Sequence, residues 1–154
     1  MRTPVWTRAA AAGLVAFMAT GAHASGLARK YCPDPARVSA PRPVPSALVA
    51  PVARAFEIDA ALAKAGSFYR CAGGRLLVCA VGANLPCGKA NVARSLPAAT
   101  TFCAGNPDAI GIPMAVTGHD TVYAWRCVGR TARAEGPAQE VDAEGYFAEY
   151  WKEL

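Results

Sequence analysis

The sequence lacks most of the motifs that mark catalysis. It contains no C-x-x-C pair, which excludes the usual thioredoxin-like redox motif, and no C-x-x-C-H for a covalently attached c-type haem. It has no G-x-S-x-G elbow of the serine-hydrolase type. Of its two histidines, only His119 lies beyond the N-terminal segment that we expect to be removed. These absences favour a non-catalytic protein without a cofactor or a metal.

Long hydrophobic runs are also missing, apart from one at the N-terminus. Residues 9–22 are apolar, but this run is shorter than the roughly 20 residues that cross a bilayer as a helix. Arg2 and Arg8 precede it, and a small-x-small site, Ala-His-Ala at residues 22–24, follows it. This is the layout of a cleavable export signal, with an uncleaved anchor as the alternative. We therefore predict a signal peptide over residues 1–24 and a mature protein, periplasmic or secreted, with no membrane span.

Clusters of like charge are absent as well. The chain carries 16 Lys and Arg against 11 Asp and Glu, a net charge of +5, and its basic residues are dispersed. Nucleic-acid-binding faces usually show runs or stripes of basic residues. We expect no nucleic-acid partner, and we expect instead an unidentified protein or polymer of the cell envelope.

Cysteine, in contrast, is plentiful. An even number of cysteines in an exported chain indicates disulfides. Their spacing matches no familiar zinc site, although a zinc site that includes His119 is an alternative. The number of cysteines leaves several pairings open. The candidates are Cys32, Cys71, Cys79, Cys87, Cys103 and Cys127.

Proline is concentrated in one segment. Six prolines fall within residues 33–51, too many for a regular helix or a central strand. We predict an extended, proline-rich arm over residues 25–51, tied to the body through Cys32, and a single α+β domain over residues 52–154. If the arm were a docking element, the protein would be a structural or assembly factor, which is a further class of function.

The start of the domain predicts a helix and a hairpin. Pro51 suits the first turn of a helix over residues 52–65, although Asp59 can cap a second helix and so divide it. The pair Gly73-Gly74 between aromatic and branched residues predicts a two-residue hairpin turn.

That turn sets the register of the hairpin. It places Cys71 opposite Leu76 and Phe68 opposite Cys79. Because side chains alternate between the two faces of a strand, Cys71 and Cys79 point to opposite faces. A bridge between them is disfavoured, and we expect each to bond a different neighbour.

The second half of the chain predicts further helices and strands. Ser95 suits the N-cap of a helix over residues 96–104, and residues 110–117 and 121–128 have the composition of strands. Asp142 precedes a C-terminal helix in which aromatic residues recur four apart. Antiparallel hairpins with flanking helices make an α+β fold, here a small domain stapled by disulfides.

One short pattern occurs twice. Residues 68–73 and residues 124–129 share the order aromatic-Arg-Cys-x-Gly. The repetition predicts two equivalent strands joined by a bridge between Cys71 and Cys127, and a chance match is the alternative.

Two turns carry the residues that we single out as a candidate binding surface. The N–H groups of the glycine-containing loop 82–89, together with a lysine, can meet an anionic group. The turn 117–121 holds the histidine between two predicted strands, where functional residues are common. The alternatives are purely structural turns or a small envelope hydrolase that uses the histidine as general acid or base. The candidates are Asn84, Lys89, His119 and Asp120.

The chain also resembles two groups of exported proteins. Residues 69–91, 113–121 and 125–127 are similar to small exported proteins of proteobacteria without an assigned activity. This resemblance spans about residues 50–154 and implies an exported single domain. The segment Tyr69-Arg70-Cys71 resembles a Tyr-x-Cys strand of periplasmic lysozyme inhibitors, which implies lysozyme inhibition as another function, although their serine- and glycine-rich loop is absent here.

Overall fold

The computed structural model describes residues 26–82, 86–136 and 138–154. The predicted signal peptide and Asn84 therefore lie outside the described residues.

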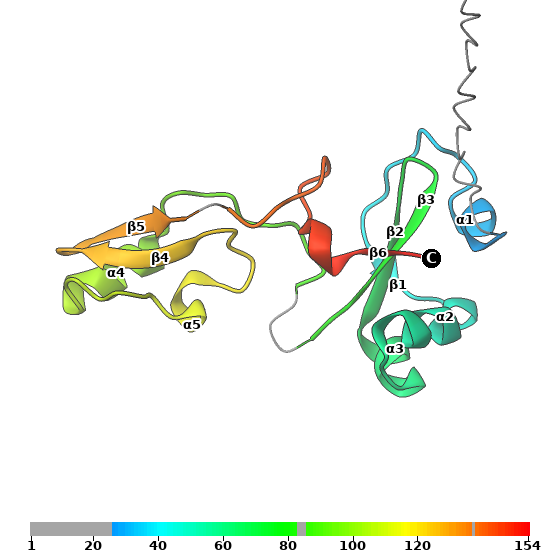
Figure 1. Ribbon diagram of the computed structural model, residues 1–154, viewed down its shortest axis with the longest axis horizontal. Coiled ribbons are helices and arrows are strands. Elements are labelled where there is room, and N and C mark those ends of the chain that lie inside the picture. Colours follow the sequence, from blue (N-terminus) through cyan, green and yellow to red (C-terminus); the bar gives the residue numbers. More distant parts are fainter. Residues whose placement is uncertain (1–25, 83–85, 137) are drawn as a thin grey trace, which may run out of the picture.

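Two lobes make up the described part of the chain (Figure 1). The four-stranded lobe comprises residues 26–82 and 142–154, and the hairpin lobe comprises residues 96–136. Extended segments connect the lobes (Figure 1). Both lobes combine helices with antiparallel strands, and disulfides staple them, which confirms the α+β fold class.

The four-stranded lobe is built on an antiparallel sheet of order β1-β2-β3-β6. Its strands are β1 (Arg42–Pro43), β2 (Ser67–Ala72), β3 (Arg75–Ala80) and β6 (Lys152–Glu153). The central hairpin has the predicted register, with Cys71 opposite Leu76 and Phe68 opposite Cys79. Gly73 and Gly74 form its turn with φ of +59° and +74°, a backbone conformation that glycine adopts without strain.

Three helices pack against this sheet: α1 (Gly26–Tyr31), α2 (Ser46–Phe56) and α3 (Ala60–Gly66). The Asp59 side chain accepts a hydrogen bond from the Leu62 N–H at 2.8 Å and caps α3, which confirms two helices rather than one. Helix α2 begins at Ser46, six residues before the predicted start at residue 52, so Pro51 lies inside it. An internal proline is costly in a helix. The complete burial of Leu48 and Val52 on one face of α2 offsets that cost.

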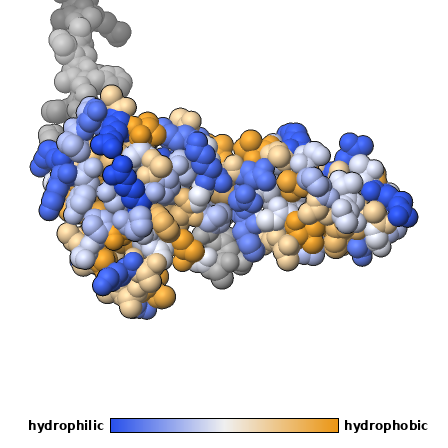
Figure 2. All heavy atoms as spheres, turned by 180° about the vertical axis from the view of Figure 1, so that it is seen from behind, coloured by the Kyte–Doolittle hydropathy of each residue, from blue (hydrophilic) through white to orange (hydrophobic). Residues whose placement is uncertain are grey.

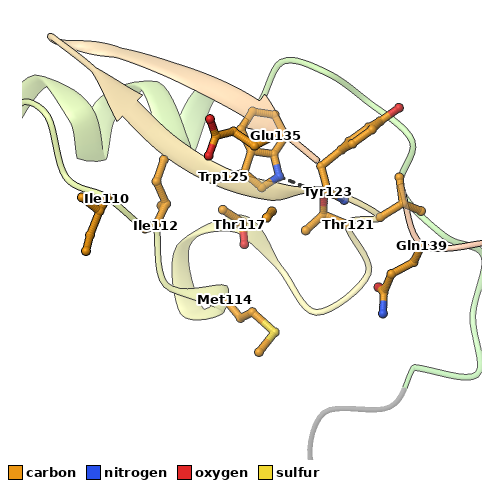
Figure 3. A pocket seen from close by; sticks show the side chains of 12 residues that line it. Ile110, Ile112, Met114, Thr117, Thr121, Tyr123, Trp125, Glu135 and Gln139 are labelled. Atoms are coloured by element: carbon orange, nitrogen blue, oxygen red, sulfur yellow. Dashed lines mark hydrogen bonds between the residues drawn. The ribbon is translucent and has the colours of Figure 1, made fainter. Parts of the chain in front are cut away.

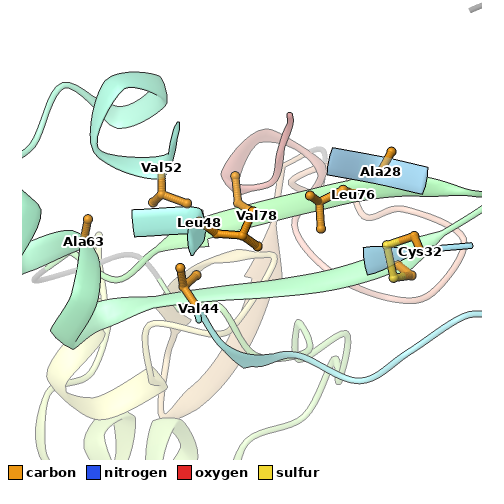
Figure 4. Close-up of a cluster of buried hydrophobic side chains, with 9 residues drawn as sticks. Ala28, Cys32, Val44, Leu48, Val52, Ala63, Leu76 and Val78 are labelled. Atoms are coloured by element: carbon orange, nitrogen blue, oxygen red, sulfur yellow. A yellow bond between two sulfur atoms is a disulfide. The ribbon is translucent and has the colours of Figure 1, made fainter. Parts of the chain in front are cut away.

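The sheet is buried on both faces. On the helix side, β3 contributes Leu76 and Val78 to a cluster that includes Leu48 of α2 (Figure 4). On the other side, Leu77 and Cys79 pack with the aromatic residues of the C-terminal segment. Because alternate residues of β3 join different clusters, its cysteine faces away from Cys71, as predicted.

The hairpin lobe has a smaller sheet that is buried on one face only. Its elements are α4 (Pro97–Gly105), α5 (Met114–Thr117), β4 (Ala124–Val128) and β5 (Thr131–Glu135). Trp125 and Cys127 of β4 pack with Ala99 and Cys103 of α4, whereas the residues between and beside them are exposed. Cys103 lies in the last turn of α4, as predicted.

Two local predictions around α4 and α5 are wrong. The N-cap of α4 is Leu96, without a side-chain hydrogen bond, rather than Ser95. Residues 110–117 do not form a strand: Pro113 lacks an N–H for strand pairing, and the short helix α5 begins directly after it.

The predicted C-terminal helix is also replaced. Oδ1 of Asp142 accepts hydrogen bonds from the Glu144 and Tyr146 N–H groups and closes a turn, and Gly145 has a φ of +82°. Only a 3-10 turn follows, η1 (Ala148–Tyr150), before β6 pairs with β3. Packing of aromatic side chains on the sheet overrides their helical spacing.

All six cysteines form disulfides. The bonds are Cys32–Cys71, Cys79–Cys87 and Cys103–Cys127. The first ties the proline-rich segment to β2, as predicted. The prediction that this segment is an extended arm is wrong, because α1, β1 and the start of α2 lie within it and bury Ala28 and Leu48 in the core. The predicted bond between Cys71 and Cys127 is wrong, because the two strands lie in different lobes and each cysteine bonds a neighbour in its own lobe.

Among the described residues, no helix has the length and apolar character needed to cross a membrane.

Candidate functional site

A cavity of about 490 Å³ opens on the hairpin lobe, and we call it the groove. It lies where α5, the start of β4 and the end of β5 meet (Figure 3). Its lining is mainly apolar, with Thr117, Thr121, Glu135 and Gln139 as polar residues. Its volume is within the range of ligand pockets, roughly 300–1,000 Å³.

Local sequence folds the chain around this groove. Pro113 begins α5, and Gly118 ends it with a φ of +86°. This φ lies in the region that glycine adopts without strain and other residues rarely adopt, and a Cβ at Gly118 would also require the Asp120 side chain to move, because its Oδ1 would lie 2.5 Å away. The reversal brings Thr117 and Thr121 back beneath β4, where both are buried (Figure 3).

Trp125 is held in place by polar contacts. Its Nε1–H donates to Oγ1 of Thr121 at 3.0 Å, and its carbonyl oxygen accepts from the Ile112 N–H at 2.9 Å. The ring of Tyr123 meets the indole edge-on, with centroids 6.5 Å apart, and the guanidinium of Arg94 lies 4.5 Å from the Tyr123 ring centroid. Because the buried indole N–H is satisfied, this aromatic wall is preorganised.

The rim of the groove exposes apolar side chains. Ile110 is 98% exposed and Met114 is 53% exposed, and both line the groove. Figure 2 shows hydrophobic residues at the surface of this lobe among polar ones. Exposed apolar residues that gather around a concave surface are typical of binding sites. The groove can therefore take up an apolar group.

The residues that the sequence predicts as a binding surface do not line the groove. Lys89 is exposed, and its Nζ lies 5.9 Å from the ring centroid of Tyr146. His119 is exposed, and Asp120 is partly buried in the turn after α5. Asn84 lies outside the described residues.

The structure does bring the chain after the loop 82–89 against the turn 117–121. The Asn91 N–H donates to the Asp120 carbonyl oxygen at 2.6 Å, and the Val122 N–H donates to the Asn91 carbonyl oxygen at 3.1 Å. This contact runs through the backbone. A binding role for Lys89 and His119 stays a prediction.

Sequence reasoning missed the apolar rim. The composition of residues 110–117 predicts a strand that includes Ile110 and Met114, and the alternation of a strand gives no sign of a groove. The signal that could have found it is Pro113, because a proline directly before Met-Ala-Val favours a helix start.

A second cluster lies on the face of the four-stranded sheet that packs against the C-terminal segment. We call it the arginine clasp, and it consists of Arg70, Asp142, Glu144, Tyr146 and Trp151. Arg70 of β2 is completely buried, and its guanidinium lies 4.3 Å and 4.6 Å from the ring centroids of Tyr146 and Trp151. It pairs with Asp142, and its Nη1 donates to Oε2 of Glu144 at 3.5 Å. The clasp fastens the C-terminal segment to the sheet, so we assign it a structural role.

In the part of the chain that the structure describes, no group of three or more His, Cys, Asp and Glu side chains is placed to hold a metal ion. The cysteines are committed to disulfides and have no free thiol to act as ligand or nucleophile.

Comparisons of the chain with protein-family models, with curated proteins and with solved structures find no match.

Proposed function

We propose that this protein is an exported, non-catalytic binding module that takes up an apolar side chain of a partner protein in the groove. The partner is a protein of the cell envelope or of the extracellular space. Three disulfides support export, because such bonds form and persist in oxidising compartments.

The observation that carries the proposal is the exposed apolar rim over a preorganised wall. Burying Ile110 and Met114 against a partner removes apolar surface from water, which is the main favourable term in protein association. The bond between Cys103 and Cys127 and the hydrogen bond to Trp125 hold the wall before a partner arrives. A rigid site loses little conformational entropy on binding.

A protein partner suits this groove better than a charged polymer. Of the polar groove residues, Glu135 pairs with Arg126, and Gln139 donates to Glu149 at 3.1 Å. The hydroxyl groups of Thr117 and Thr121 are also hydrogen-bonded within the chain. The polar side chains of the groove are thus engaged, and the apolar surface is what remains for a ligand.

Site-specific photo-crosslinking tests the proposal. A photoreactive phenylalanine at Met114 is expected to form adducts with a partner in cells that export the protein. Val128 is a matched control site, because it is exposed and apolar on β4 but lies outside the groove. Ile110→Asp on the rim should abolish the Met114 adduct, since a carboxylate resists burial. Equal adducts at both sites, or none at Met114, would refute the groove as the binding site.

A further inference from the structure

The outer edge of β4 is already occupied. The Cys127 N–H donates to the Ala109 carbonyl oxygen at 2.8 Å, and the Trp125 carbonyl oxygen accepts from the Ile112 N–H at 2.9 Å. The chain before α5 therefore runs along β4 and satisfies the backbone groups that point away from β5.

This pairing determines where the backbone groups of β5 point. Trp125 lies opposite Ala134, and Cys127 lies opposite Ala132. In an antiparallel ladder, two opposed residues exchange both hydrogen bonds or neither. The backbone groups of Trp125 and Cys127 point away from β5. The N–H and C=O groups of Ala132 and Ala134 must therefore point away from β4.

Those groups on β5 are unpaired within the part of the chain that the structure describes. The backbone N–H and C=O groups of Ala132 and Ala134 make no hydrogen bond with any described residue. Two donors and two acceptors therefore alternate along one open strand edge. Such an edge is a template for an added strand.

The edges of the four-stranded sheet, in contrast, have features that oppose pairing with an added strand. Its edge strands, β1 and β6, have two residues each, and β1 contains Pro43, which has no N–H to donate. Short strands and proline are common protections against edge pairing. Strand β5 has five residues and no proline.

Charge around the open edge indicates what would pair with it. Arg130 in the turn and Arg133 on β5 are exposed, and neither forms an ion pair with a described residue. The one acid on β5, Glu135, already pairs with Arg126. The edge is therefore flanked by two uncompensated positive charges, which complement an acidic segment.

The same arginines disfavour pairing with a second copy of this chain. An antiparallel pair of β5 strands centred on Arg133 would place two guanidinium groups opposite each other. Arg133 already lies opposite Arg126 on β4, so a second copy in this register would add further guanidinium groups to the same face of the sheet. Like charges opposite each other destabilise a strand pair, and the charge pattern therefore favours a different polypeptide.

We propose that the outer edge of β5 is a strand-addition site for an extended, acidic segment of a partner protein. The segment pairs through its backbone with Ala132 and Ala134, and its carboxylates meet Arg130 and Arg133. The site shares strand β5 with the groove, but none of the four residues that it uses lines the groove, so it does not depend on the proposed function.

Selection of short displayed peptides against the full mature protein tests the site. The probes are random peptides, and the bound sequences are read out and made synthetically. We expect enrichment of Asp and Glu among β-forming residues. In hydrogen-exchange measurements, a bound peptide should protect the amides of Ala132 and Ala134. Binders without acidic residues, or binders that protect other amides, would overturn the proposal.

Two variants locate the interaction. Ala134→Pro removes an outward N–H and should weaken peptide binding at least about tenfold. Ala98→Pro is the matched control, because the first turn of α4 tolerates proline, and it should bind normally. The double variant Arg130→Glu/Arg133→Glu keeps the backbone intact and should also weaken binding about tenfold, with the loss largest at low salt. Normal binding by the charge-reversal variant would refute the acidic segment.

Two further results separate this site from its alternatives. Ile110→Asp in the groove should leave peptide binding unchanged; a loss would assign the peptides to the groove instead. Sedimentation of the mature protein should show a monomer. A dimer that Ala134→Pro dissociates would show that the edge pairs with itself and would overturn the proposal.

Discussion

The two hairpins contain the same short pattern and place its arginine in opposite surroundings. In β2, Arg70 is completely buried between two aromatic rings and beside two carboxylates. In β4, the side chain of Arg126 is 49% exposed and pairs with Glu135 on the open face. Both arginines stand three residues before a glycine of the turn. The environment of an arginine thus depends on what covers its face of the sheet.

The two lobes also differ in how completely their sheets are covered. The four-stranded lobe covers both faces of its sheet and closes both edges with short strands. The hairpin lobe covers one face and leaves one edge and an apolar groove exposed. We infer that the four-stranded lobe supplies most of the stability and that the hairpin lobe carries the binding surfaces.

The largest expected effect comes from breaking the arginine clasp. Arg70→Ala leaves Asp142 and Glu144 without a counter-charge and opens a gap between two rings, so we expect a loss of about 3 kcal/mol in the free energy of unfolding. Arg126→Ala removes an exposed pair and should cost less than about 1 kcal/mol. Urea unfolding of both variants measures the difference. Equal losses would contradict the contrast between the two strands.

The comparison is sharpened further by removing two disulfides separately: the one inside the hairpin lobe and the one that ties β3 to the connecting segment. The double variant Cys103→Ala/Cys127→Ala opens a loop with a sequence separation of 24, and the chain-entropy model gives a loss of about 3 kcal/mol. Cys79→Ala/Cys87→Ala opens a separation of only 8 and should cost roughly 1 kcal/mol less. Hydrogen exchange should show protection lost in the hairpin lobe alone for the first variant. Loss of protection throughout the chain would mean that the lobes unfold together.

A smaller effect is expected at the turn after α5. Gly118→Ala forces a side chain into a φ of +86° and against Asp120, so it should cost about 1 kcal/mol or slightly more. Gly105→Ala is the matched control, because its Cβ meets nothing within 4 Å, and it should be neutral or slightly stabilising. Thermal unfolding compares the two variants. A neutral Gly118→Ala would show that the reversal beneath β4 is not tight.

The smallest effect is expected at the histidine. His119→Ala removes an exposed side chain, so stability should change by less than about 0.5 kcal/mol, and the Met114 adduct should persist. Thermal unfolding measures the change in stability, and the crosslinking assay measures the Met114 adduct. If the exported protein shows a hydrolytic activity that this variant loses, the hydrolase alternative replaces the binding module.

Much of the first hairpin could be predicted because its determinants are local. The Gly73-Gly74 turn and the two-residue period of a strand determine the register and the opposite facing of Cys71 and Cys79. The cap at Asp59 follows from its own side chain and the next three residues. The candidate site could not be predicted in the same way, because Ile110 and Met114 line a groove only when α5 folds back beneath β4.

The amino-acid sequence by itself determined the elements whose causes lie within a few residues: the hairpin register, the second cap, and the presence of both helices and antiparallel strands. Only the tertiary structure decided the disulfide pairing, the burial of Arg70, the groove and the open edge of β5. Each of these depends on segments far apart in the chain meeting at one place. The local pattern around an arginine or a cysteine is the same whether its face of the sheet is covered or open to solvent.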